Sequence, residues 1–224
     1  MDTITNSPAA LALRNHFLLQ RMQTGSLTLP QLSVVLSQWY HPLHHFPDFL
    51  SHHIASAPGI APKTAISRIL WQELGEGEPR RAHENLFITT LQGAGIDTHE
   101  LLEASTLPAT QALIDAYNDS REYLESLGYL FATESIDLPM VSALGAAIRR
   151  VTGTTDLPWV DIHVRQEPDH TDSAGLALEQ GLSAGEARVA IEAAHAMFHL
   201  WVRFFDGIAA AFDTLPEPVL RSIA

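Results

Sequence analysis

The sequence predicts an all-α protein, and three observations lead to this prediction. Apolar residues recur at helical spacing over most of the 224 residues, as Leu11, Leu18 and Met22 do near the N-terminus. Helix-starting patterns precede such segments, for example Ser7 followed by Pro8, an N-cap residue with proline at the first helical position. No segment alternates between apolar and polar residues for more than a few positions, so no strand is expected.

The helical spacing marks out most of the chain, segment by segment. Helices are expected within residues 8–23, 29–41, 61–75, 78–95, 97–105, 107–136, 140–151 and 182–212. No repeat period and no low-complexity linker interrupts them, so residues 1–224 are expected to form one domain. The prediction is a bundle of about eight to ten helices.

Capping residues support several of these boundaries. Asp97 with Glu100, and Ser183 with Glu186, have the spacing of a capping box, in which each residue satisfies a backbone N–H of the first turn. Gly75 closes the third segment, as glycine commonly does after a helix. These signals indicate where the helices begin and end.

The composition excludes several classes of protein. The chain has no cysteine, which excludes disulfides, cysteine-based zinc sites and a cysteine nucleophile. Its 26 acidic and 13 basic residues give a net charge of −13, which disfavours binding to nucleic acid or to an anionic membrane. No apolar run approaches the roughly 18 residues of a membrane span, and the N-terminus does not resemble a secretory signal. We therefore expect a cytoplasmic protein.

One segment has the spacing of metal ligands. His163, Glu167 and His170 follow the pattern His-x3-Glu-x2-His, and offsets of three, four and seven residues return to one face of a helix. Carboxylate and imidazole together suit iron or manganese. The alternative is an exposed charged stretch. Pro168 also disfavours helical geometry at Glu167, so the helix is expected to kink or end there.

Two other segments offer further ligands. Glu73 and His83 lie at the end of one expected helix and the start of the next, with a glycine-containing turn between them. Glu76, in that turn, competes with Glu73 because it lies seven residues before His83. Glu134 lies among apolar residues, where a carboxylate is costly unless it is paired or bound to metal. Its alternative is a helix-end residue facing water.

In order, these segments resemble the haem-oxygenase-like diiron oxidases and oxygenases, the iron-containing redox enzymes related to the TenA and PQQ-synthase-C proteins. The resemblance covers residues 30–210. It rests on five stretches in the same order, which read "QWYHPLHHFPDFL", "ELGEGEPRRAHENLF", "GYLFATESIDLP", "HVRQEPDH" and "AAHAMFHLWVRFFDGI".

The resemblance implies a haem-oxygenase-like helical bundle, commonly a homodimer, that binds two Fe(II) ions, with manganese as a possible replacement. It implies six metal ligands: Glu73, His83, Glu134, His163, Glu167 and His170. Such an enzyme uses dioxygen to hydroxylate, desaturate or oxidatively cleave a small substrate, for example an amino acid derivative or a fatty acid.

The substrate pocket is expected between the early helix and the last long helix. Aromatic candidates for its lining are Trp39, Tyr40, Phe198, Trp201 and Phe205, and candidates to hold a substrate carboxylate are Arg150 and Arg165.

Other histidines are weaker candidates. Five lie between His41 and His53, but Pro42 and Pro47 are expected to break the helix that would present them. His195 and His199, four residues apart, are expected to pack or to line the pocket. His16 is the haem candidate, and a core histidine is the commoner interpretation.

Two other functions remain open. One is a metal-free enzyme of the same fold, either a TenA-like hydrolase or a cofactorless oxidase, although the absence of cysteine argues against the usual TenA nucleophile. The other is a helical binding or scaffold protein without catalysis. Nucleotide-binding glycine motifs are absent from the sequence.

Overall fold

The computed structural model describes residues 2–25, 27–179 and 182–215, and for residues 2, 3, 167–169, 176, 177 and 179 it describes the backbone alone. Within these ranges the chain forms α-helices and two short 3-10 helices, with no strand, so the all-α prediction is confirmed. The elements are α1 (Asp2–Thr5), α2 (Pro8–Arg14), α3 (Phe17–Thr24), α4 (Leu29–Ser56), α5 (Ile60–Glu73), η1 (Pro79–Arg81), α6 (His83–Gly93), α7 (Thr98–Leu102), α8 (Pro108–Asp119), α9 (Tyr123–Thr152), α10 (Pro158–Glu179), α11 (Ala184–Ala211) and η2 (Phe212–Thr214).

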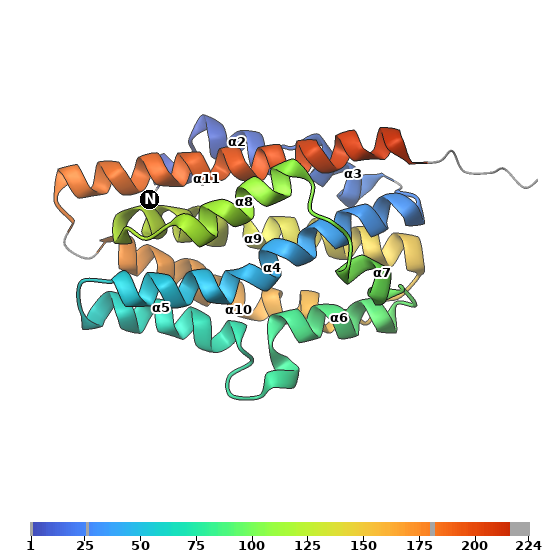
Figure 1. Ribbon diagram of the computed structural model, residues 1–224, viewed down its shortest axis with the longest axis horizontal. Coiled ribbons are helices and arrows are strands. Elements are labelled where there is room, and N and C mark those ends of the chain that lie inside the picture. The colour runs from blue at the N-terminus through green and yellow to red at the C-terminus, as the bar shows by residue number, and fades with distance from the viewer. Residues whose placement is uncertain (1, 26, 180–181, 216–224) are drawn as a thin grey trace, which may run out of the picture.

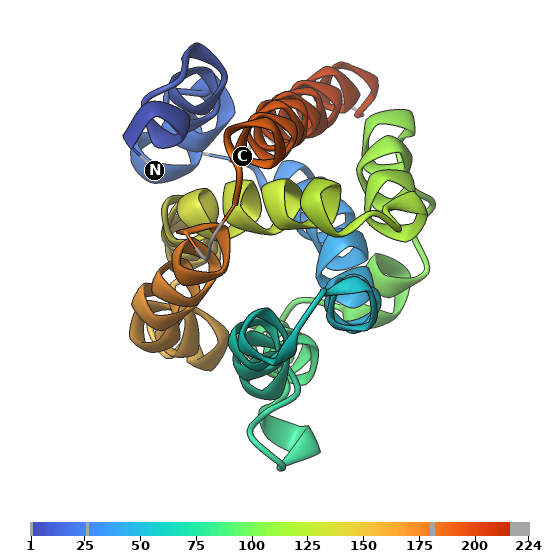
Figure 2. The ribbon, with the colours of Figure 1, turned by 90° about the vertical axis from the view of Figure 1, so that its left-hand side faces the viewer.

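The four longest helices, α4, α9, α10 and α11, form the body of the bundle (Figure 1). Helix α9 packs against α11, α10 and α3, while α4 packs against α5 and α8. The view in Figure 2 shows α1–α3 at one corner beside α11, and α5 and α6 at the opposite side. The turn that joins α5 to α6 projects from the bundle.

Side-chain caps fix several helix starts as the sequence predicts. Ser183 and Glu186 form a complete capping box at the start of α11. Asp97 accepts a hydrogen bond from the backbone N–H of His99 at the start of α7, so it caps the helix without completing the expected capping box with Glu100. These caps satisfy N–H groups that have no partner within the first helical turn.

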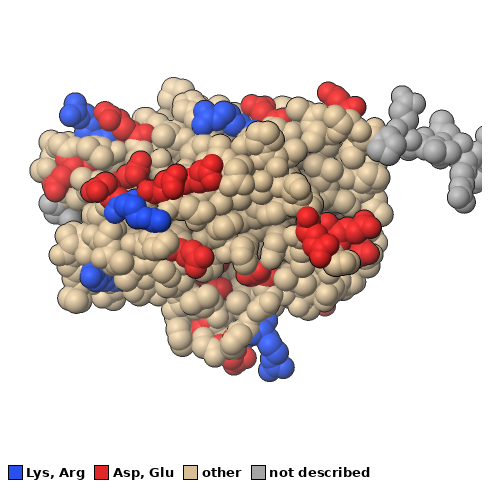
Figure 3. Space-filling model, in the orientation of Figure 1, with Lys and Arg blue, Asp and Glu red and all other residues tan. Residues whose placement is uncertain are grey.

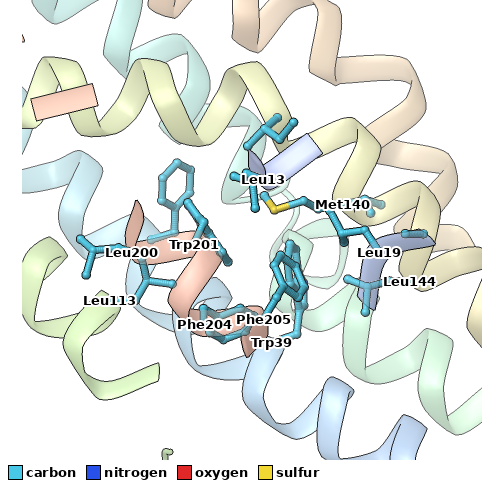
Figure 4. Packing of buried hydrophobic residues seen from close by; sticks show 14 of the residues in the cluster. Leu13, Leu19, Trp39, Leu113, Met140, Leu144, Leu200, Trp201, Phe204 and Phe205 are labelled. Carbon is cyan, nitrogen blue, oxygen red and sulfur yellow. The ribbon is translucent and has the colours of Figure 1, made fainter. Parts of the chain in front are cut away.

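Aromatic side chains from α4 and α11 form much of the core. Trp39 lies 5.5 Å from Trp201 between ring centroids, and Trp201 lies 5.2 Å from Phe204. Figure 4 shows these rings together with Phe205 and with Leu13, Leu19, Met140 and Leu144 around them. Trp39 and Trp201 are no more than 4% exposed. This packing brings the middle of α4 against α11.

Helices α9 and α11 approach closely at Gly128. A Cβ at that position would lie 2.2 Å from the carbonyl oxygen of Ala190 and 2.7 Å from the Cβ of Ala193. Both are too close for any side chain, so only glycine fits. The contact fixes the position of α9, which carries part of the candidate site.

The prolines do not break the helices. Helix α4 continues through Pro42 and Pro47, so the expected break there is wrong. Helix α9 continues through Pro139, which joins two segments that the sequence suggested were separate. Helix α10 continues through Pro168 to Glu179. A proline costs an internal helix about 3 kcal/mol, and the packing of these long apolar faces outweighs that cost.

The expected long helix over residues 107–136 is two helices, which is a second correction. It divides between Asp119, the last residue of α8, and Tyr123, the first of α9. Ser120 and Ser126 share a hydrogen bond of 2.6 Å across the break. Serine hydroxyls compete with helical backbone hydrogen bonds, which explains why apolar spacing alone did not locate this turn.

Acidic side chains predominate on the face shown in Figure 3, where they form separate groups on a largely uncharged surface. In the described part of the chain no helix is long and apolar enough to span a membrane.

Candidate metal centre

Five of the predicted ligands converge inside the bundle from four helices. Glu73 is the last residue of α5 and His83 the first of α6. Glu134 lies in the first half of α9, and His163 and His170 lie two turns apart on α10. All five are at most 6% exposed.

Their polar atoms lie within contact distance. Nδ1 of His83 lies 2.9 Å from Oε2 of Glu73. Nδ1 of His170 lies 3.7 Å from Oε1 of Glu73 and 3.3 Å from Oε2 of Glu134. The rings of His83 and His163 are 4.5 Å apart between centroids. Glu73 therefore connects α6 to α10, and His170 connects Glu73 to Glu134.

The turn between α5 and α6 places Glu73 opposite His83. Gly75 has a φ of 82°, and a Cβ there would lie 2.4 Å from the carbonyl oxygen of Glu78. Glycine is therefore required for the turn to close. Glu76, the competing ligand, lies in this turn and pairs with Arg81 at 3.0 Å on the surface. The structure brings Glu73, and not Glu76, to His83.

The charges in this cluster are strongly coupled. Burial raises the pKa of Glu73, but His83 and His170 outweigh it and lower the pKa to about 2. Burial lowers the pKa of His170, but Glu134 and Glu73 raise it to about 9, and Glu73 likewise raises the pKa of His83. Burial and the charge of His83 lower the pKa of His163 to about 3. The pKa shifts of His83 and His170 thus favour their protonated forms beside the buried carboxylates.

Neighbouring groups fix the orientation of two imidazoles. Nδ1 of His163 donates to the carbonyl oxygen of Trp159 at 2.7 Å, which leaves Nε2 as the nitrogen with the lone pair. Nε2 of His83 donates to Oε1 of Gln166 at 2.9 Å, which directs Nδ1 toward Glu73. Backbone carbonyls and amides hold metal-binding histidines in the same way.

These residues fit a metal chemically. Buried carboxylates and imidazoles are ligands for iron or manganese, and Oε1 of Glu134 is buried with no hydrogen bond to a described residue. Ligand atoms that share one ion are separated by about 3.0–3.4 Å when each bond is about 2.1 Å, close to the N···O distances here. The described side chains meet in pairs, however, and no three of them are arranged around a common point.

Glu167, the sixth predicted ligand, lies in helix α10, and its side chain is outside the described residues, as is that of Pro168. Its position among the ligands therefore stays a prediction.

A cavity of about 40 Å³ adjoins the cluster. Glu73, Glu134 and His163 line it together with residues that are mainly aromatic and apolar. The full lining is Trp39, Pro42, Leu43, Phe46, Glu73, Tyr117, Thr133, Glu134, Asp137, His163 and Trp201. This volume holds a few water molecules or a small molecule.

The cavity wall contains a polar trio from α8, α9 and α11. The hydroxyls of Tyr117 and Thr133 share a hydrogen bond of 3.1 Å, and Nε1 of Trp201 donates to Thr133 at 3.4 Å. Nε1 of Trp39 is buried with no hydrogen bond to a described residue. These groups give the aromatic side of the cavity a limited capacity for hydrogen bonding.

The predicted lining residues fall into two groups. Trp39 and Trp201 line the cavity. Tyr40 lies half-buried on α4, where its hydroxyl donates to Glu84 at 2.9 Å, and Phe198 and Phe205 are buried in the core.

The two predicted arginines do not line this cavity. Arg150 donates to the carbonyl oxygens of Met22 and Gln23, which ties α9 to α3. Arg165 is exposed, and its Nε lies 3.4 Å from the carbonyl oxygen of Asp161. Both side chains therefore serve contacts that the sequence pattern did not reveal.

His16, the haem candidate, caps a helix. Its Nδ1 accepts the backbone N–H of Leu18 at the start of α3, and its Nε2 lies 3.2 Å from Asp206. On α11, His195 is partly buried and His199 is exposed.

Sequence reasoning missed Asp137 and Gln166. Asp137 lines the cavity and lies three residues after Glu134, and Gln166 lies three residues after His163. Residues three apart share a face of a helix, so this spacing was the available signal.

Comparisons with known proteins agree with this fold. The sequence model of a family described as iron-containing redox enzymes matches residues 33–202. Among solved structures, a CADD-like protein of unknown function from Nostoc punctiforme is similar with a TM-score of 0.75, 14% identity and coverage of 98% of this chain and 94% of that one. A domain of unknown function with a heme oxygenase-like fold from Shewanella denitrificans has a TM-score of 0.73, 17% identity and coverage of 92% and 88%.

A TenA homologue from Pseudomonas syringae has a TM-score of 0.70, 12% identity and coverage of 93% of this chain and 92% of that one. No curated protein matches the chain. These structural similarities, at low identity, show a heme oxygenase-like fold, as the sequence resemblance implied.

Proposed function

The chain belongs to the family of iron-containing redox enzymes, and from that membership we propose that it is a non-haem diiron oxidase or oxygenase. It binds two Fe(II) ions, with manganese as a possible replacement, and uses dioxygen to oxidise a small substrate. The observation that carries this proposal is the buried cluster of two glutamates and three histidines beside a cavity.

The proposed ligands are Glu73, His83, Glu134, His163 and His170, with Glu167 as the sixth. When bound, the two ferrous ions supply electrons that reduce dioxygen and so permit oxidation of a substrate C–H bond. The protein's part is to hold the ligand atoms in place. Trp159 and Gln166 orient two imidazoles, and the surrounding core excludes bulk water.

The substrate is proposed to contact the aromatic residues that line the cavity. Trp39 and Trp201 offer flat apolar surfaces, and Thr133 and Tyr117 offer hydroxyls. The cavity is small, so the part of the substrate that reaches the ligands is small and mainly apolar. Because Arg150 and Arg165 bind backbone carbonyls elsewhere, we assign neither a role in holding a substrate carboxylate.

The proposal is tested by loading the purified protein with Fe(II) without oxygen. We expect about two iron ions per chain, followed by a transient visible absorption band when dioxygen is added. Glu134→Gln removes one buried carboxylate charge and should reduce bound iron. Glu100→Gln makes the same change at an exposed position on α7 and serves as the matched control.

Iron uptake near zero in the wild-type protein would contradict the proposal. It would leave the metal-free enzyme and the scaffold as the remaining functions. Equal iron content in wild type and Glu134→Gln, with two ions bound in each, would instead show that the ligands lie elsewhere.

A further inference from the structure

We propose that Asp137 is a further metal ligand of this centre, paired with His163, so that α9 supplies two carboxylates instead of one. This inference rests on the proposed function, because it concerns the same ions. It adds a residue that the family resemblance did not indicate.

The first argument is position. Asp137 lies three residues after Glu134 on α9, and residues at this spacing lie on the same face of a helix. Both side chains line the cavity. The side chain of Asp137 is 14% exposed, compared with 3% for Glu134. Asp137 is therefore the more exposed of the two cavity-lining carboxylates of α9.

The second argument is its facing partner. Oδ2 of Asp137 lies 3.8 Å from Nε2 of His163, which is too long for a hydrogen bond. Because Nδ1 of His163 donates to Trp159, Nε2 presents its lone pair. A carboxylate oxygen and an imidazole lone pair that face each other at this distance suit a cation between them, since each is an electron-pair donor.

The third argument is how the ligands divide. His83 contacts Glu73, and His170 contacts both Glu73 and Glu134, so these four residues form one connected group. Among the described side chains, Asp137 has a carboxylate oxygen 3.8 Å from Nε2 of His163. Carboxylates around both ions offset the charge of a two-ion centre, and Asp137 adds one beside His163.

The test measures metal binding instead of turnover. Asp137→Asn keeps the shape of the side chain and removes its charge. Asp119→Asn makes the same chemical change at the exposed end of α8 and is the matched control. For each protein, Fe(II) is titrated without oxygen and bound iron is counted. Co(II) is then used as a second probe, because its visible spectrum responds to the ligands around it.

We expect wild type and Asp119→Asn to bind about two ions with the same Co(II) spectrum. Asp137→Asn should bind at least one ion about tenfold or more weakly, which is the size of effect seen when groups around a metal are removed, and its Co(II) spectrum should change. Asp137→Glu keeps the charge and should restore part of the affinity. It also serves as the second variant if Asp137→Asn does not fold.

Two outcomes separate this inference from the proposed function. If wild type binds no metal, the proposed function fails and this inference fails with it. If wild type binds two ions and Asp137→Asn binds them with unchanged affinity and spectrum, the diiron proposal stands and Asp137 is not a ligand. If Asp137→Glu folds and binds metal as tightly as wild type but gives a different Co(II) spectrum, the result would still support direct contact between residue 137 and the metal.

Discussion

Two regions of the molecule are rich in histidine, and they differ in burial, in the number of helices that supply the histidines and in their carboxylate partners. Between His41 and His53, helix α4 carries five histidines, of which four are exposed or only partly buried. His41 binds the carbonyl oxygen of Ala104, and His44 lies 2.9 Å from Glu84 at the surface. The buried cluster has only three histidines, but they come from two helices and meet two glutamates.

The difference shows why the buried cluster, and not α4, is the proposed metal site. A single helix can place many imidazoles close together in sequence, yet adjacent positions such as His44 and His45 point to different sides of it. Separate helices can direct their side chains inward to one volume, where carboxylates offset the charge of a cation and burial excludes water. Convergence with carboxylates, not the number of histidines, distinguishes the two regions.

The largest expected effect separates the two regions directly. His163→Ala should remove at least one of two bound iron ions, because a buried ligand atom is lost. His44→Ala, which removes an exposed imidazole, should leave iron content unchanged. Iron is counted after anaerobic loading of both variants. Iron loss in His44→Ala with full occupancy in His163→Ala would reverse the comparison.

A second effect concerns stability. Ligands that bind only the folded state stabilise it by about 2.7 kcal/mol at one hundred times the dissociation constant. Removing iron with a chelator should therefore lower the melting temperature of wild type and of His44→Ala, measured by thermal unfolding. His163→Ala should respond much less. A chelator response of equal size in all three proteins would mean that His163 does not bind the metal.

A third effect concerns α4 itself, because His53 is the buried one of its five histidines. Burial lowers the pKa of His53 to about 3, whereas an unfolded chain has a value near 6.5. As the pH falls, the unfolded state therefore binds a proton on this histidine at a higher pH than the folded state does. The stability that His53 contributes by staying neutral is complete above pH 6.5 and is lost as the pH falls toward 3.

The slope is about 1.4 kcal/mol per pH unit for one proton. His53→Leu should reduce the loss of unfolding free energy between pH 6 and pH 5 by about 1 kcal/mol, as measured by urea unfolding at each pH. His52→Leu, at the exposed neighbouring position, is the control and should behave as wild type. Parallel pH curves for wild type and His53→Leu would show that this histidine does not control acid stability.

The smallest effect is expected when Glu84, a surface acid beside the histidine-rich segment of α4, is replaced, and it concerns the pKa of Tyr40. Burial and Glu84 together raise the pKa of Tyr40 to about 12. Glu84→Gln should lower that pKa while leaving it above the ordinary value, since burial remains. The ultraviolet titration of the phenol measures this. Stability should change by less than about 1 kcal/mol, and a change in iron content would contradict the assignment of Glu84 to the surface.

Much of this structure could be predicted from the sequence. Apolar spacing and caps gave the helices, because both depend on local chemistry. The family resemblance implied the grouping of Glu73, His83, Glu134, His163 and His170, and the structure places these five side chains together. Helix continuity through Pro42, Pro47 and Pro139 could not be predicted, because it depends on distant packing that outweighs a local cost. The contacts of Arg150 depend on α3, which lies far away in the sequence.

Asp137 shows a different limit. Its spacing from Glu134 was visible, but its distance from His163 depends on how α9 and α10 cross. The sequence of either helix does not specify the angle at which the two helices cross.

The placement of the ligands has a consequence for biosynthesis. Glu73 belongs to a helix made early, whereas His170 lies in the second half of α10. A ribosome must therefore have released most of the chain before the two residues can meet. In the proposed centre, a metal ion that is held by residues of both helices can therefore be inserted only after α10 has been made. Metal supply would then act on the protein after its synthesis and not during it.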